Sequence, residues 1–113
     1  TKLLNWLNLI TGWDMDMDEF LLAGDRIYNL KRLYNVKCGI SRKDDTLPPR
    51  ILNNPRKGGG GANHLPPLNL MLNQYYEARG WDEFGIPLPE TLKKLGLINE
   101  ENEVVLLQNA NKD

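Results

Sequence analysis

Apolar residues in the first third of the chain recur at spacings of three and four, which is the period of an α-helix. The pattern predicts a long helix over residues 17–37, with Asp16 as its N-cap, Glu19 as the capping-box partner and Gly39 as its stop. One apolar stripe runs along it, widened on its flanks and so typical of burial against more than one neighbour. The stripe comprises Phe20, Ala23, Gly24, Ile27, Leu30 and Tyr34, and its flanks are Leu21, Tyr28 and Leu33. Because glycine inside a helix costs about 1 kcal/mol relative to alanine, Gly24 predicts close approach by another element.

Shorter helices are predicted on both sides of the long one. They cover residues 2–11, residues 68–79 and a segment that starts at Pro89 and ends at Gly96. Residues 47–49, Leu-Pro-Pro, predict no regular structure, and residues 53–67 form a long irregular segment with a run of four glycines. The apolar run at residues 104–107 is too short to decide between helix and strand, and a last short helix or a frayed end is expected. The prediction is an all-α fold, a compact helical domain of four to five helices with long irregular loops.

Length and composition indicate one domain over residues 1–113, with a single core. The sequence has neither an apolar run near the roughly 18 residues of a membrane span nor a secretory signal pattern, so we expect a cytoplasmic protein without a membrane partner. The single Cys38 excludes an internal disulfide and cannot alone build a zinc or iron–sulfur site. The chain enters a helix almost directly after Thr1, which suggests a piece of a longer protein.

Basic residues concentrate between Arg26 and Lys57. That segment contains nine basic residues and two acidic ones, a net charge of +7, and the remainder has five basic and thirteen acidic residues, a net charge of −8. Such asymmetry indicates a partner of opposite sign: phosphate groups, an acidic protein or an acidic neighbouring domain. A solvated helix face with a charged loop is the alternative.

The residues that carry chemistry do not form a complete active site. The sequence has no dinucleotide-binding glycine motif, P-loop, zinc-protease motif or calcium loop. His64 is the only histidine, and its role, like that of Cys38, stays open between chemistry and simple exposure. Asp44 and Asp45 have the composition of an acid/base pair, but the adjacent Arg42 and Lys43 would hold both ionised, which favours ion pairs.

Three segments in register carry a family resemblance. They are TGWD (residues 11–14), GDRIYNLKRLYNVKCGISRKDDTLPPR (residues 24–50) and NQYYEARGWDEFGIPLPETLKKLGL (residues 73–97). In this order they resemble the C-terminal helical domain of the aldehyde ferredoxin oxidoreductase family, the tungsten-pterin enzymes of anaerobes. The resemblance implies an enzyme that oxidises aldehydes to carboxylic acids and passes electrons through a [4Fe–4S] cluster to ferredoxin. It also implies two molybdopterin-type cofactors on the metal, and it leaves open which aldehyde is used and whether the metal is tungsten or molybdenum.

The family's pterin and cluster motif, Asp-x-x-Gly-Leu-Cys, precedes the TGWD segment and has no counterpart in this sequence. Cys38 stands where the family typically has a charged residue, so it is not the cluster ligand. We therefore expect no catalytic residue, metal ligand or cofactor in this chain, and no activity from it in isolation. Its expected role is a structural and channel-forming part that contacts the remaining domains of the enzyme.

The charged loop is the expected functional site within that part. Arg42 and Lys43 are expected to face the cofactor-bearing domains or their phosphates. The loop-shaping residues are expected to be Asp44, Asp45 and Arg50, with the aspartates paired to Arg50 or Arg26.

Two further interpretations remain. The basic segment 26–57 is suited to docking an acidic electron carrier such as ferredoxin. It also suits a stand-alone helical module that binds a protein or nucleic acid. Nucleic acid is disfavoured because the Tyr and Trp residues lie mainly on apolar stripes, whereas nucleic-acid surfaces usually expose aromatic rings.

Overall fold

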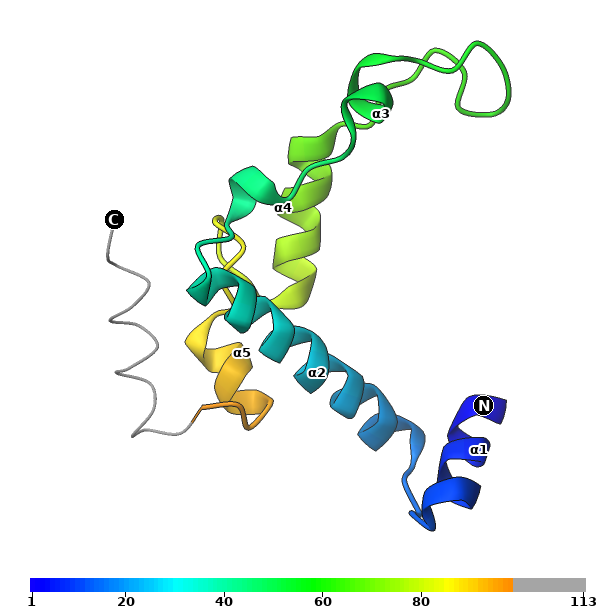
Figure 1. The fold of residues 1–113 in the computed structure, drawn as a ribbon, viewed down its shortest axis with the longest axis vertical. Helices are drawn as coiled ribbons and strands as arrows, with labels where there is room; N and C mark the ends of the chain where they lie inside the picture. Colours follow the sequence, from blue (N-terminus) through cyan, green and yellow to red (C-terminus); the bar gives the residue numbers. More distant parts are fainter. Residues whose placement is uncertain (99–113) are drawn as a thin grey trace.

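The computed structural model describes residues 1–98, which form helices joined by loops (Figure 1). The elements are α1 (Lys2–Thr11), α2 (Met17–Lys37), the 3₁₀ turn η1 (Arg42–Asp44), α3 (Pro49–Asn53), α4 (Leu68–Arg79) and α5 (Pro89–Lys94). Within this part of the chain, pairing of extended backbone is limited to isolated bridges. The predicted all-α fold of four to five helices is confirmed. The apolar run at residues 104–107 lies outside the described residues.

Helices α2, α4 and α5 form the packed part of the molecule, and two arms leave it (Figure 1). One arm is α1, beyond the N-terminal end of α2, and the other carries α3 and the glycine-rich loop beyond the start of α4. The radius of gyration is 18.3 Å, whereas a compact domain of this length has about 13 Å. Much of the surface of both arms is therefore free of contacts with the packed part. None of the helices in the described part is long and apolar enough to span a bilayer.

The helix boundaries follow local signals in the sequence. The predicted bounds of α1, α2 and α4 are confirmed. At the start of α2, the Glu19 amide donates to Asp16 Oδ1 at 2.8 Å and the Asp16 amide donates to Glu19 Oε2 at 3.2 Å, which is the predicted capping box. Gly39 follows the last turn of α2 with φ of 86°, a left-handed conformation that glycine adopts without a Cβ clash.

The core lies where α4, α5 and the turn between them meet α2. Its buried apolar side chains include Tyr76, Trp81, Leu92 and Leu95. The Trp81 indole lies 5.8 Å from the Tyr76 ring and donates a 2.8 Å hydrogen bond to Asn29 Oδ1 on α2. This bond ties the α4–α5 turn to the middle of the long helix.

The buried face of α2 is not the predicted apolar stripe. Ile27 and Leu30 are 58% exposed and Tyr34 is 70% exposed, whereas Asn29 and Arg32 are the residues of α2 that become buried. Residues two positions apart in a helix are rotated by about 200° around its axis, so Ile27 and Asn29 point to nearly opposite sides. Burial of the polar face is tolerated because Asn29 and Arg32 find hydrogen-bond partners across the core.

Gly24 also departs from the prediction. A Cβ placed on Gly24 would have no neighbouring atom within 4 Å, so close approach by another element of the described chain is wrong as an explanation for this glycine. It lies on the same exposed side of α2 as Ile27. Gly24 thus shares one uncovered surface with Ile27, Leu30 and Tyr34.

Helix α3 (Pro49–Asn53) is a third departure, because the Leu-Pro-Pro segment at residues 47–49 was expected to lack regular structure. Pro49 instead occupies the first position of α3. A proline fits there because that position needs no amide donor and its fixed φ already suits a helix. The short helix places Arg50 in its first turn.

Candidate functional site

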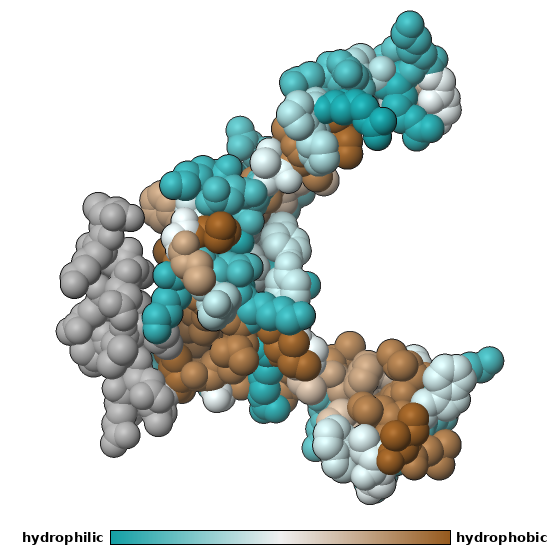
Figure 2. Space-filling model, in the orientation of Figure 1, coloured by the Kyte–Doolittle hydropathy of each residue, from teal (hydrophilic) through white to brown (hydrophobic). Residues whose placement is uncertain are grey.

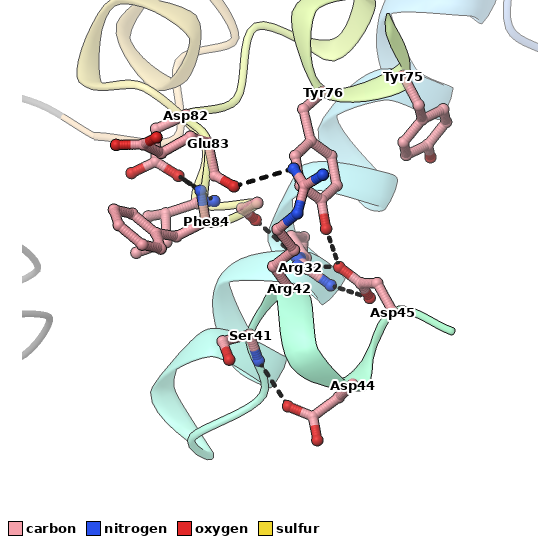
Figure 3. Close-up of polar contacts among 12 residues, drawn as sticks. Arg32, Ser41, Arg42, Asp44, Asp45, Tyr75, Tyr76, Asp82, Glu83 and Phe84 are labelled. Carbon is pink, nitrogen blue, oxygen red and sulfur yellow. Dashed lines mark hydrogen bonds and ion pairs between the residues drawn. The ribbon is translucent and has the colours of Figure 1, made fainter. Parts of the chain in front are cut away.

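The charged loop after α2 is anchored by an ion pair that crosses the core. Arg32 Nη1 donates to Asp45 Oδ1 at 2.8 Å and Nη2 donates to Asp45 Oδ2 at 2.6 Å (Figure 3). The remaining guanidinium donor, Nε, bonds the Gly85 carbonyl at 2.7 Å, and the Tyr76 hydroxyl donates to Asp45 Oδ2. One carboxylate therefore joins α2, α4 and the charged loop.

The surroundings fix the ionisation of these groups. Burial by itself would raise the pKa of Asp45, but hydrogen bonds from Arg32 and Tyr76 and the Arg32 charge outweigh it, so the pKa lies below its ordinary value. Burial opposes the charge on Arg32 as well, yet its bonds to Asp45 leave its pKa raised. Burial, followed by the bond to Asp45, raises the pKa of Tyr76 to about 12. At neutral pH the cluster holds a cation, an anion and a neutral phenol.

Arg42 fastens the same loop to the α4–α5 side of the molecule. Its Nη1 donates to the Glu83 carbonyl and its Nη2 to the Asn69 carbonyl, both at 3.2 Å. The Arg42 amide donates to the Phe84 carbonyl at 3.1 Å, and the guanidinium lies 5.4 Å from the centre of the Tyr76 ring (Figure 3). Arg42 is therefore engaged within the domain.

Lys43, next to Arg42, has an exposed side chain. The expectation that Arg42 and Lys43 face the cofactor-bearing part of an enzyme stays a prediction. Of the two, Lys43 is the one whose charge is presented outward.

The partners expected for the aspartates are wrong. Asp45 pairs with Arg32, while Arg26 Nε donates to the Leu95 carbonyl at 2.8 Å. Asp44 Oδ2 accepts from the Ser41 amide at 2.9 Å and so closes the η1 turn locally. Arg50 lies on α3, beyond the loop. Asp45 pairs with Arg32 because Arg32 lies on the buried face of α2, next to the carboxylate. Arg26 lies near the end of α5 instead.

Sequence reasoning missed Arg32 and Tyr76 as members of this cluster. Arg32 was counted with the charged segment, and Tyr76 with an apolar stripe. The available signal was that Asn29, Arg32 and Val36 share one side of α2, at spacings of three and four.

A hollow of about 420 Å³ lies beside Arg42, between α4 and the following turn. Four acidic residues, Glu77, Asp82, Glu83 and Glu90, are among those that line it, together with Arg42 and Tyr76. Asp82 is bonded within its own turn, because its Oδ1 accepts from the amides of Phe84 and Ile86 at 2.9 and 2.8 Å.

Among residues 1–98, His, Cys, Asp and Glu side chains form no group of three able to hold a metal ion. His64 and Cys38 are both exposed, far apart in the chain, and their roles stay open.

Comparison with known proteins connects this architecture to one group of enzymes. Residues 1–97 match the family model described as aldehyde ferredoxin oxidoreductase, domains 2 and 3. The tungsten-containing aldehyde ferredoxin oxidoreductase of Pyrococcus horikoshii is 46% identical over 92 residues, which cover 80% of this chain and 15% of the relative. The tungsten-containing aldehyde ferredoxin oxidoreductase of Pyrococcus furiosus is 42% identical over 92 residues, with the same shares of both chains covered.

A more distant relative extends the match along the chain. The aliphatic sulfonate oxidoreductase, WOR-like subunit, of Pyrococcus furiosus is 33% identical over 112 residues, which cover 91% of this chain and 18% of that protein. The chain thus spans less than one fifth of the length of each of these relatives.

Proposed function

The chain belongs to the aldehyde ferredoxin oxidoreductase family, and we propose that it is a C-terminal helical domain of a tungsten-dependent enzyme of this kind. In the proposed enzyme an aldehyde is oxidised to a carboxylic acid, and electrons pass through a [4Fe–4S] cluster to ferredoxin. The contribution of this chain is structural: it covers and positions the parts that carry the cofactors. Its partners are the remaining domains of the same enzyme.

The side chains of the described part do not fit a tungsten or iron–sulfur site. A [4Fe–4S] cluster is held by four thiolates, and the sequence has only Cys38. No group of three His, Cys, Asp or Glu side chains converges within residues 1–98. We therefore assign no step of the reaction to this chain, and place the metal donors in other parts of the enzyme.

The observation that carries the proposal is the uncovered apolar surface of α1 and α2. Leu9 and Ile10 on α1 are 82% and 84% exposed, and the stripe of α2 that contains Ile27 and Leu30 is also uncovered. Figure 2 shows hydrophobic residues gathered over α1 and the adjoining end of α2. Contiguous apolar surface of this kind marks an interface rather than a solvent-facing side. The relatives are more than five times as long as this chain, so a larger enzyme has ample polypeptide to cover it.

The same observation explains the unusual burial in α2. The polar face of α2 packs on α4 and α5, and its apolar face is left for a second layer. A helix that is buried on both sides belongs in the interior of a larger protein. We infer that α2 lies between the α4–α5 layer and another domain of the oxidoreductase.

A stand-alone module that binds protein or nucleic acid through segment 26–57 has less support. Three arginines of that segment are engaged within the domain: Arg26 with the Leu95 carbonyl, Arg32 with Asp45, and Arg42 with the carbonyls of Asn69 and Glu83. Their charge is used to hold the fold together.

The test compares one substitution in two contexts. Ile27→Gln in the complete oxidoreductase should lower the free energy of unfolding by about 2 kcal/mol and reduce aldehyde-dependent ferredoxin reduction, because a buried Ile side chain contributes about 1.5–3 kcal/mol. In the 113-residue chain the same change should alter stability by no more than about 0.5 kcal/mol, because the side chain is exposed there. Equal, small effects in both contexts would show that this face of α2 meets solvent in the enzyme too, and the proposal would be wrong.

A further inference from the structure

A second hollow is lined by residues of α3 and of the segment that follows it. These elements form the arm that extends beyond the start of α4 (Figure 1). The volume of the hollow is about 620 Å³. The hollow is lined by Arg50, Ile51, Asn54, Pro55, Arg56, His64 and Pro66. Its polar members are therefore two guanidinium groups, an imidazole and an amide, and its other members are apolar. Figure 2 shows that the end of this arm is mainly hydrophilic.

Local structure brings these side chains together. Arg50 is held in the first turn of α3, directly after Pro49. The glycine-rich loop then folds back: the Ala62 amide donates to the Gly59 carbonyl at 3.0 Å, and the Asn63 amide donates to the Arg56 carbonyl at 2.9 Å. Asn63 adopts a left-handed conformation, with φ of 62°, to make this return. As a result His64 lies on the same hollow as Arg50 and Arg56.

Within residues 1–98, neither arginine of the hollow forms an ion pair with a carboxylate. The sequence contains no Asp or Glu between Asp45 and Glu77. The chain has six arginines, and four of them bond a carbonyl or a carboxylate: Arg26, Arg32, Arg42 and Arg79. The remaining two, Arg50 and Arg56, make no ion pair or side-chain hydrogen bond with any other residue in the described part of the chain. Both unengaged arginines line this one hollow.

We infer that the hollow binds a phosphate monoester of a small organic molecule. Guanidinium groups present their donors in a planar fork that matches the oxygens of phosphate, so Arg50 and Arg56 would hold the phosphate, with His64 as a further donor. Ile51, Pro55 and Pro66 provide an apolar wall for the organic part of the ligand. The volume falls within the roughly 300–1,000 Å³ of small-ligand sites, so the hollow has room for more than a bare phosphate.

The site is separate from the apolar surface on which the proposed role in the oxidoreductase rests. It uses residues 50–66, whereas that surface belongs to α1 and α2. Failure of one proposal therefore leaves the other standing.

The test uses three probes on the 113-residue chain at constant ionic strength, with binding followed by NMR chemical shifts. The probes are phenyl phosphate, inorganic phosphate and a single-stranded oligonucleotide. Phenyl phosphate should bind saturably, more tightly than inorganic phosphate, and shift signals from residues 50–66. Arg50→Gln and Arg56→Gln should each weaken its binding about tenfold or more, because each removes a charge-assisted hydrogen-bonding group.

Lys31→Gln is the matched control, since it removes one positive charge from an exposed position on α2. It should change the affinity for phenyl phosphate by less than about twofold. Three outcomes overturn the proposal: no saturable binding of phenyl phosphate, equal weakening by Lys31→Gln and the two arginine variants, or unchanged binding in both arginine variants. Preference for the oligonucleotide, with steep loss of binding as salt rises, would also overturn it and assign the basic arm to nucleic acid.

Discussion

Arg32 and Asp45 meet through two parallel hydrogen bonds, of 2.8 and 2.6 Å, although one belongs to the long helix and the other to the loop that follows it. The pair sits under the turn that contains Gly85. A Cβ on Gly85 would lie 2.3 Å from Arg32 Nη2 and 2.8 Å from the Tyr76 ring, and its φ of 78° already favours glycine. The ion pair, the phenol and the glycine thus form one closely packed unit.

Removal of the charge on Asp45 should destabilise the chain strongly. Asp45→Asn leaves the Arg32 guanidinium buried without its counter-ion, and breaking such pairs costs about 3–5 kcal/mol. Because the Asp45 side chain is partly open to solvent, we expect about 3 kcal/mol, measured as the free energy of unfolding in urea.

Asp44→Asn is the control, because it removes the same charge from the adjacent, exposed residue. Within the described residues the Asp44 side chain bonds only the Ser41 amide, so its loss should cost about 1 kcal/mol or less. Similar losses in the two variants would mean that the ion pair does not anchor the loop.

The Tyr76 hydroxyl should give stability a dependence on alkaline pH. Burial and the bond to Asp45 raise its folded-state pKa to about 12 from the ordinary 10.0. A group whose pKa is raised on folding stabilises the protein fully below its unfolded pKa, and this contribution is lost as pH rises from 10 towards 12. Tyr76→Phe should lower stability by about 1 kcal/mol at neutral pH and weaken the decline at alkaline pH.

Tyr34→Phe is the matched control for that measurement, since Tyr34 is 70% exposed on α2. Its stability curve between neutral pH and pH 12 should follow that of the unmodified chain. Identical alkaline declines in stability for all three proteins would contradict the assignment to Tyr76.

On the acid side, the pKa of Asp45 is lowered in the folded chain. The ion pair should therefore lose its stabilising effect as pH falls below 3.8, the ordinary pKa of an aspartate.

Much of the fold could be predicted because its signals are local. The capping box at Asp16 and Glu19 and the 3.6-residue period indicated where α2 begins, and Gly39 indicated where it stops. The buried face of α2 could not be predicted in this way. Asn29 and Arg32 are buried because their partners, Trp81 and Gly85, come from more than fifty residues further along the chain.

The candidate site shows the same limit. The charged loop was found from its sequence, but the partner of Asp45 was assigned to Arg26 or Arg50 when it is Arg32. An arginine on a helix is normally exposed, so only its place on the side of α2 shared with Asn29 and Val36 distinguishes Arg32 from Lys31. The apolar stripe of α2 predicted burial, but Ile27, Leu30 and Tyr34 are exposed. A domain of a larger protein keeps apolar surface for contacts with its other parts.

Substitution by alanine should change the stability of the chain in opposite directions at Gly24 and Gly80. Gly24→Ala should raise the free energy of unfolding of the 113-residue chain by up to about 1 kcal/mol, because the position is helical and open. Gly80→Ala should lower it by more than about 1 kcal/mol, since φ is 65° and the new Cβ would lie 2.3 Å from Thr91 Oγ1. Thermal unfolding followed by circular dichroism measures both. A loss of stability in Gly24→Ala would show that an element does approach this face.

Arg42 and Lys43 have different surroundings, and this difference separates folding from function in the charged loop. Arg42 bonds two carbonyls within the domain, so Arg42→Ala should lower the stability of the 113-residue chain by about 1–2 kcal/mol. Lys43 is exposed, so Lys43→Ala should leave that stability within about 0.5 kcal/mol of the original. Lys43 is therefore the better probe of contacts with the rest of the enzyme.

In the complete oxidoreductase, the double variant Arg42→Ala, Lys43→Ala should reduce cofactor content or aldehyde turnover. Part of this loss should come from a destabilised loop, through Arg42. Lys43→Ala alone should cause the remaining part. We expect about a tenfold effect for the single change, the size of one charge-assisted contact with an anionic group. Lys37→Ala is the control, because it removes an exposed lysine from the last turn of α2, close to the same loop. Metal and pterin content and aldehyde-dependent ferredoxin reduction are measured side by side. If Lys43→Ala and Lys37→Ala both match the unmodified enzyme while Arg42→Ala loses stability, the loop holds the domain together and does not contact the cofactor-bearing part.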